Sequence, residues 1–174
     1  MEGGMIYRFG KDINDPDMMK FGAYYRKADY GSIGNFQYFR NLFAIFNRDE
    51  YLKAEQGLPL PSDVWLPGIQ VMMARDHTGS TRGLFVAAKG GNNDESHNHN
   101  DVGNFIVYYN GQPVLIDVGR GTYTRKTFSD QRYDIWSNCS DYHNLPTVNG
   151  LTQPAGPDFK AGGVEYREDK SFAA

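Results

Sequence analysis

Several residue types are scarce in this sequence, and each scarcity excludes a class of protein. It contains a single cysteine, Cys139, so no disulfide bond can form within the chain. Lys and Arg number 18 against 21 Asp and Glu, without a dense basic patch, which argues against nucleic acid as the main partner. No apolar run approaches the roughly 20 residues of a membrane-spanning helix. The first four residues are neither basic nor apolar, so we expect no signal peptide there either.

Histidine is also scarce, and three of the four histidines fall between residues 97 and 143. The segment 96–101 reads Ser-His-Asn-His-Asn-Asp and precedes an apolar run that ends at Tyr109. Asn110 and Gly111 follow, and then a second apolar run closes on Asp117. Asn-Gly between two apolar runs is a strong β-hairpin signal, because both turn residues must accept a positive φ. The hairpin therefore predicts that Asp117 returns to the end where the histidines lie.

His97, His99 and Asp101 alternate along the chain. In an extended strand alternate side chains point to one side, so we expect these three to share a face. Two imidazoles and a carboxylate suit a borderline cation such as zinc, and His143 is the candidate for a further ligand. The alternative stays open, because a His-x-His pair also arises by chance with a structural or exposed role. His77, in a polar turn, is expected at the surface.

The pattern of the chain predicts a mainly β fold preceded by a helical segment. Aromatic residues spaced at three and four predict an amphipathic helix over 36–52, whereas residues 1–34 carry little periodicity. Short apolar runs separated by turn residues, with two Asn-Gly pairs, predict an antiparallel β-sandwich. The expected strands cover residues 64–75, 84–88, 105–109, 113–118 and 164–167.

The boundary between these parts is expected at about residues 57–61, which are rich in Gly and Pro. Residues 1–60 are then a helical segment or linker, and residues 61–174 are the β-sandwich. The final residues, 170–174, carry no turn or cap signal, so we expect the sandwich to be incomplete at its C-terminus.

Several motifs, taken in order over about residues 84–150, resemble the heparinase II/III-like polysaccharide lyases. They are the His-x-His-x-Asp segment at 97–101, the Asn-Gly turn at 110–111, the Asp-x-Gly at 117–119, and a later His-Asn at 143–144 before Val-Asn-Gly at 148–150. The resemblance implies a helical α/α toroid followed by an antiparallel β-sandwich, with the active site in the cleft between them. This chain would supply the last toroid helices or linker and the first part of the sandwich.

The resemblance also implies roles for individual residues. His99, Asp117 and His143 would bind Zn(II), and His97 would be the catalytic histidine facing the cleft, with Asp101 a partner able to fix an imidazole tautomer. The active-site tyrosine of the sandwich matches either Tyr123 or Tyr133. The remaining catalytic groups of the family belong to the toroid, so this chain alone would hold an incomplete site.

The implied activity is β-elimination from a uronic-acid-containing acidic polysaccharide such as a glycosaminoglycan, in a bacterial parent that is periplasmic or secreted. Elimination requires a neutralised carboxylate, a base for the C5 proton and an acid for O4. Tyr and His suit the proton transfers. Arg125 and Arg132 are candidates to hold carboxylate or sulfate, the alternative being two solvated charges.

Two other function classes remain open. A metal-dependent hydrolase would use the His-x-His-x-Asp segment, but that motif continues with a His where this chain has Val102. A non-catalytic polysaccharide-binding β-sandwich is compatible with the high aromatic content of 14%. Simple binding, however, does not require converging His and Asp side chains.

Overall fold

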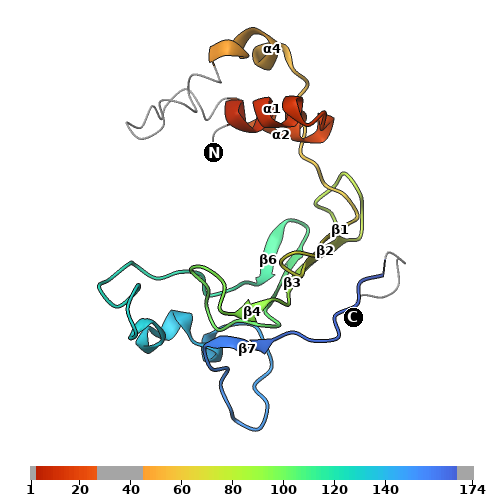
Figure 1. Cartoon of the computed structure of the whole chain (residues 1–174). Coiled ribbons are helices and arrows are strands. Elements are labelled where there is room, and N and C mark those ends of the chain that lie inside the picture. Colours follow the sequence, from red (N-terminus) through yellow and green to blue (C-terminus); the bar gives the residue numbers. More distant parts are fainter. Residues whose placement is uncertain (1–2, 27–44, 168–174) are drawn as a thin grey trace. The chain divides into compact units, whose positions relative to one another are not determined.

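The computed structural model describes residues 3–26 and 45–167 (Figure 1). The chain divides into two compact units, Met1–Leu60 and Pro61–Ala174. None of the helices in the described ranges combines the length and the apolar character needed to cross a bilayer.

The first unit contains three described helices: α1 (Gly3–Asp12), α2 (Pro16–Tyr24) and α4 (Arg48–Lys53). The start of α2 has a local cause, because the Asp15 carboxylate accepts a hydrogen bond from the Met18 amide at 2.9 Å and Pro16 occupies the first turn. A Cβ on Gly22 would lie 2.5 Å from the Tyr7 nitrogen, so this glycine lets α1 and α2 approach closely. The low periodicity of residues 1–34 had given no sign of these two helices.

The helix expected over 36–52 is only partly within the described residues. Its described part is interrupted at Asn47, and α4 begins one residue later. Phe46 is 79% exposed, whereas Tyr51 is buried against Tyr7 with a ring-centroid distance of 5.5 Å. The prediction of a continuous aromatic helix face is therefore wrong for residues 45–52.

The second unit is mainly β and sandwich-like, as predicted. Its larger sheet has five antiparallel strands in the order β1-β2-β3-β5-β6, and a smaller sheet pairs β4 with β7. The strands of the larger sheet are β1 (Asp63–Leu66), β2 (Val71–Arg75), β3 (Leu84–Lys89), β5 (Phe105–Tyr109) and β6 (Gln112–Leu115). Those of the smaller sheet are β4 (Asn92–Asn93) and β7 (Gly156–Lys160).

Two strand predictions were wrong in detail. The single strand expected over 64–75 is a hairpin, because Pro67, Gly68 and a positive φ of 51° at Gln70 turn the chain between β1 and β2. The strand expected over 164–167 is absent from that stretch, and the last described strand is β7. Tyr166 instead stacks on Trp65 with ring centroids 5.3 Å apart.

Both Asn-Gly turns form as predicted. Asn110 and Gly111 have φ values of 51° and 74° and connect β5 to β6. Asn149 and Gly150, with φ values of 53° and 70°, form the turn between Val148 and Leu151, which pair as an isolated β-bridge. Positive φ at both positions is the type I′ geometry that matches strand twist. The first hairpin brings the end of β6 back toward the start of β5.

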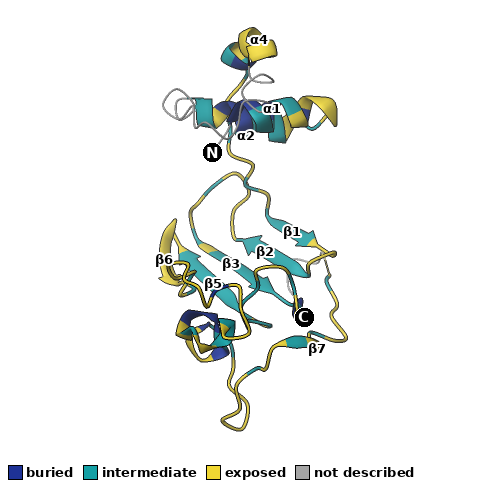
Figure 2. Ribbon diagram, turned by 60° about the vertical axis from the view of Figure 1, so that its left-hand side comes forward, coloured by how far each residue is buried: buried dark blue, intermediate teal, exposed yellow. Residues whose placement is uncertain are grey.

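The interior of the second unit is polar. Among the described residues, the buried hydrophobic side chains are Tyr7, Ala23 and Tyr51, which all belong to the first unit. The buried polar side chains of the second unit are Asn93, Asn100, Thr127, Ser137, Asn138, Ser140 and His143. Figure 2 shows the larger sheet mostly at intermediate exposure, with the deepest burial of this unit outside it. Hydrogen bonding, rather than apolar packing, therefore organises the most buried part of this unit.

Candidate functional site

The His-x-His-x-Asp segment forms a loop and not a strand. His97 has a φ of 61°, a left-handed conformation that is uncommon for a residue with a side chain. The expectation that His97, His99 and Asp101 share one strand face is therefore wrong. The His97 ring contacts Phe128 edge-on at 5.2 Å, whereas the His99 ring lies 5.2 Å from that of His143. The loop thus gives the two histidines different surroundings.

Three short helical turns (Arg132–Asp134, Trp136–Asn138 and Ser140–Tyr142) follow a polar stretch and support this loop. Arg132 donates to the Asn98 carbonyl through Nε at 3.1 Å and Nη2 at 2.7 Å, and to the Thr127 carbonyl through Nη1 at 2.6 Å. Tyr133 donates its hydroxyl to Asn98 Oδ1 at 3.0 Å. These contacts fix the residue that separates the two histidines.

A second set of hydrogen bonds fixes the far end of the loop. The Asn100 amide donates to the Asn138 carbonyl at 2.9 Å, and Asn100 Nδ2 donates to the Gln153 carbonyl at 3.0 Å. Gln153 also exchanges two hydrogen bonds with the backbone of Val102. The nearby Cys139 thiol donates to the Tyr133 carbonyl at 2.9 Å, and burial, with Asp141 and Asp134 adding to it, raises its pKa. Cys139 is therefore a structural thiol rather than a nucleophile.

Asp117 and His143 form a close pair behind the loop. Asp117 Oδ2 lies 2.5 Å from His143 Nδ1 and accepts a hydrogen bond from Asn104 Nδ2 at 2.7 Å, while Oδ1 accepts from the Gly119 amide at 2.7 Å. Burial alone would raise the pKa of Asp117, but the hydrogen bonds from His143, Gly119 and Asn104 outweigh it and lower the pKa. The ionised carboxylate only accepts, so Nδ1 of His143 carries the proton.

The other imidazole nitrogen of His143, Nε2, lacks a hydrogen bond, as do a few other buried polar atoms of the described residues. His143 Nε2 is buried and has no hydrogen-bond partner among the described residues. With the proton on Nδ1, a neutral imidazole has its lone pair on Nε2. A buried lone pair without a donor is costly unless another group uses it.

His99 lies beside that ring in surroundings that disfavour its charged form. Burial is the main cause that lowers the pKa of His99; the unfavourable approach of a second positive charge on His143 or Arg132 adds to it, and Asp101 and Asp117 act in the opposite direction. A neutral imidazole retains a lone pair for a proton or a metal ion.

These residues provide a donor set whose chemistry fits a zinc ion. His99, Asp117 and His143 are neighbours, and their nitrogen and oxygen donors are those that zinc accepts. As the side chains stand, the described ranges contain no group of three or more His, Cys, Asp or Glu arranged around a common metal position. Asp117 contacts His143 directly, as in the carboxylate–histidine pairs that orient metal-binding imidazoles.

Asp101 is engaged elsewhere. Its carboxylate lies 2.9 Å from Lys89 Nζ, which also contacts Glu95 at 3.1 Å. Burial alone would lower the pKa of Lys89, but the hydrogen bonds and charges of Asp101 and Glu95 raise it. Asp101 therefore anchors the loop to β3. The tautomer-fixing contact expected of Asp101 is made by Asp117 to His143.

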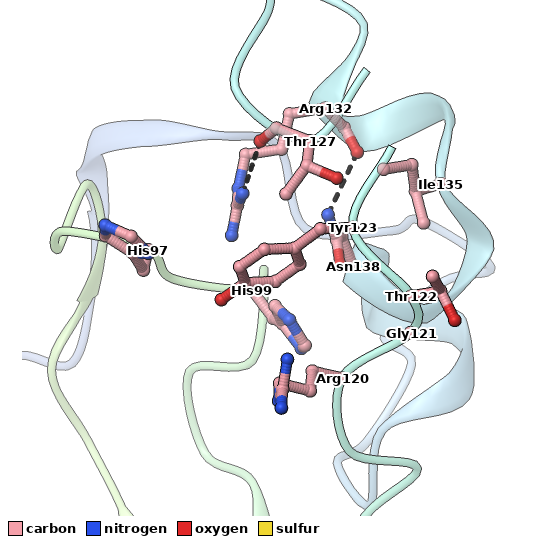
Figure 3. Close-up of a pocket in the computed structure, with 10 residues that line it drawn as sticks. All are labelled: His97, His99, Arg120, Gly121, Thr122, Tyr123, Thr127, Arg132, Ile135 and Asn138. Carbon is pink, nitrogen blue, oxygen red and sulfur yellow. Dashed lines mark hydrogen bonds between the residues drawn. The ribbon is translucent and has the colours of Figure 1, made fainter. Parts of the chain in front are cut away.

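A pocket of about 400 Å³, including its open mouth, lies in front of the histidines (Figure 3). It is lined by His97, His99, Arg120, Gly121, Thr122, Tyr123, Thr127, Arg132, Ile135 and Asn138. In the view of Figure 3, His97 stands apart on its own loop, with Tyr123 nearer the centre of the labelled side chains. The enclosed part is only about 80 Å³, below the roughly 300–1,000 Å³ of small-ligand sites, so it would take part of a sugar unit rather than a whole ligand.

Only some of the site residues suggested by the sequence line the pocket. It includes His97, Tyr123 and Arg132, whereas Tyr133 and Arg125 are not among its lining residues. Sequence reasoning missed Arg120, which enters the pocket between two glycines directly after the Asp-x-Gly motif. The signal available in the sequence was the position of Arg120 in a Gly-Arg-Gly segment directly after a motif that the family resemblance had singled out.

Comparison with known proteins gives one family. The family described as heparinase II/III-like, C-terminal matches residues 67–172, which include the whole site. A search of curated proteins gives no match.

Proposed function

This chain belongs to the heparinase II/III-like family, and on that premise we propose that it is the β-sandwich part of a lyase that cleaves uronic-acid-containing polysaccharide by β-elimination. The observation that supports this most is the pocket that His97 and Tyr123 line together. A helical toroid domain in the natural parent protein would supply the opposite wall. A periplasmic or secreted location stays a prediction.

The proposed chemistry needs no water. His97 accepts the C5 proton of the uronate, the electron pair forms the C4–C5 double bond, and the C4–O4 bond breaks as Tyr123 donates its proton to O4. A later proton transfer from His97 to Tyr123 restores both groups. The edge contact of the His97 ring with Phe128 and the fixing of Asn98 by Arg132 support this assignment, because they orient the imidazole.

Tyr123 is a better candidate for the acid than Tyr133. The Tyr123 ring contacts Phe128 at a centroid distance of 5.4 Å, and its residue lines the pocket. The Tyr133 hydroxyl is already engaged with Asn98. We therefore assign Tyr133 to positioning of the loop.

The proposal includes a zinc ion held by His99, Asp117 and His143. When bound, the ion would supply a structural cross-link between the loop, the segment after β6 and the His-Asn segment. The buried and unpartnered Nε2 of His143 supports His143 as a ligand, since zinc would satisfy it. Asp117, which bonds to Nδ1 on the other side of the ring, would turn toward the ion to complete the set. We expect His99→Ala and His143→Ala to lose bound zinc in elemental analysis and His97→Ala to retain it. Equal zinc content in all three variants would contradict the ligand assignment.

The activity is tested by incubating the natural parent protein with unsulfated and sulfated uronic-acid polysaccharides while ultraviolet absorbance is recorded. A lyase produces an unsaturated uronate that absorbs, whereas a hydrolase or a binding module does not. We expect product with wild type and none with His97→Ala, and the variant should keep the wild-type circular dichroism spectrum. Absorbing product from a folded His97→Ala protein would show that His97 is not the base.

A further inference from the structure

Two arginines line the pocket, and only one of them, Arg132, is hydrogen-bonded to the protein backbone. The Arg132 guanidinium is committed to the backbone carbonyls of Asn98 and Thr127. Arg120 is exposed, and its side chain forms no ion pair or hydrogen bond with the described residues. Its guanidinium carbon lies 5.3 Å from the centre of the Tyr123 ring. Arg120 is therefore the pocket cation whose donors remain available.

The backbone around Arg120 explains why it points into the pocket. Asp117 accepts a hydrogen bond from the Gly119 amide, and Gly119 has a φ of 70°. This turn changes the direction of the chain after β6. It places Arg120 at the pocket, next to the Asp117–His143 pair. The cation–π contact with the Tyr123 ring then holds the guanidinium beside the phenol. Figure 3 shows Arg120 and Tyr123 leading off the same segment of ribbon.

From this arrangement we infer that Arg120 binds the carboxylate of the uronic acid unit that is cleaved. The inference rests on the proposed lyase function and names the group that recognises its substrate. A guanidinium offers two parallel N–H donors that match the two carboxylate oxygens. Pairing the carboxylate withdraws negative charge from the centre next to C5, so the C5 proton becomes more acidic. The position also explains why Tyr123, beside Arg120, would meet the leaving oxygen of the same sugar unit.

Arg125 provides the matched control. The sequence left it open between a contact with the substrate and a solvated charge, and we take it as a solvated charge because it does not line the pocket. It is an arginine five residues away, it is exposed, and it does not line the pocket. Replacing either arginine by glutamine removes one positive charge from the same segment. A general effect of net charge would therefore appear in both variants, whereas a site effect would appear only in Arg120→Gln.

The test uses two ligands that differ only in the carboxylate: an unsulfated uronic-acid oligosaccharide and its carboxyl-reduced counterpart. Binding to the chain is measured by titration calorimetry, and elimination is measured in the natural parent. We expect wild type and Arg125→Gln to prefer the acidic ligand by about tenfold, the value of one charge-assisted pair. Arg120→Gln should bind both ligands equally, and Arg120→Lys should recover part of the preference. In the parent, Arg120→Gln should slow elimination at least as strongly.

The possible failures are distinguishable. If Arg120→Gln keeps the full preference for the acidic ligand while the wild-type parent produces unsaturated uronate, the role of Arg120 is wrong and the lyase function stands. If the wild-type parent produces none, the lyase function fails and the inference fails with it. Equal losses in Arg120→Gln and Arg125→Gln would reduce the effect to net charge and would also overturn the inference.

Discussion

Replacement of Arg132 by methionine should release the loop that carries both histidines. Methionine keeps much of the aliphatic stem and removes all three hydrogen bonds to the Asn98 and Thr127 carbonyls. Hydrogen bonds from a charged donor contribute about 1.5–3 kcal/mol each, but two of these share one acceptor and are not additive. We therefore expect the loop to lose about 2–4 kcal/mol of local stability.

The conformation of His97 adds to this expectation. A left-handed φ at a non-glycine residue costs about 1–2 kcal/mol, and the loop relaxes toward an ordinary conformation once Asn98 is released. The sharpest measurement is hydrogen exchange at the Asn98 and Asn100 amides, which bond to the Glu95 and Asn138 carbonyls. A loss of 2–4 kcal/mol should accelerate their exchange by about thirtyfold to several hundredfold.

The same change at Arg125 is the control, because that side chain is exposed and forms no hydrogen bond with the described residues. In Arg125→Met, hydrogen exchange at the Asn98 and Asn100 amides should match that of wild type. Unchanged exchange at Asn98 and Asn100 in Arg132→Met would show that the arginine does not hold the loop, and would remove the structural reason for the His97 conformation.

Two further predictions concern the frame around the site. The pKa of Lys89 is raised above 10.5 by its two acidic partners, so the pair stabilises the fold below that pH and the contribution is lost as pH rises through the folded pKa. Urea unfolding should therefore show a decline above pH 10.5 that Lys89→Met reduces, and identical pH profiles would exclude this contribution. Gly111→Ala should cost about 1 kcal/mol or more in the same assay because its φ is 74°. Gly68→Ala, where an added Cβ meets nothing within 4 Å, is the matched control, and equal costs would contradict the turn argument.

Local chemistry made part of the fold predictable. Asn110-Gly111 and Asn149-Gly150 specify their turns by themselves, because few other pairs accept two positive φ values. The hairpin in turn placed Asp117 near His99. By contrast, Pro67-Gly68 gave a turn signal within an apolar stretch that was assigned to one strand.

Other elements depend on distant partners and were missed for that reason. The strand Gly156–Lys160 contains Gly and Pro, and it forms because Asn92 and Asn93 offer a partner edge about sixty residues earlier in the chain. The left-handed His97 likewise stands next to a long-range contact, because Arg132 reaches the Asn98 carbonyl across more than thirty residues of chain. Alternation along 97–101 could not reveal it, because the pattern assumes an extended backbone.

The sequence predicted which residues lie at the site better than it predicted their positions and contacts. His99 lies beside His143, and His143 contacts Asp117, since a hairpin and a short polar segment carry these residues; their binding of a metal stays a prediction. The assignments of Arg132 and Tyr133 to substrate and catalysis could not be checked from spacing, because a guanidinium or phenol serves a carbonyl as readily as a sugar. Only the structure distinguishes Arg132, which binds backbone carbonyls, from Arg120, whose donors remain available in the pocket.

The amide-rich interior of the second unit has a calorimetric consequence. Newly hydrated apolar area raises the heat capacity on unfolding, and newly hydrated polar area lowers it. Asparagine and serine occupy the positions of deepest burial there, while the sheet is already half hydrated in the folded state. Its melting should therefore show a heat-capacity step below the usual value of about 12–15 cal/mol/K per residue, and its stability should vary little between cold and warm conditions.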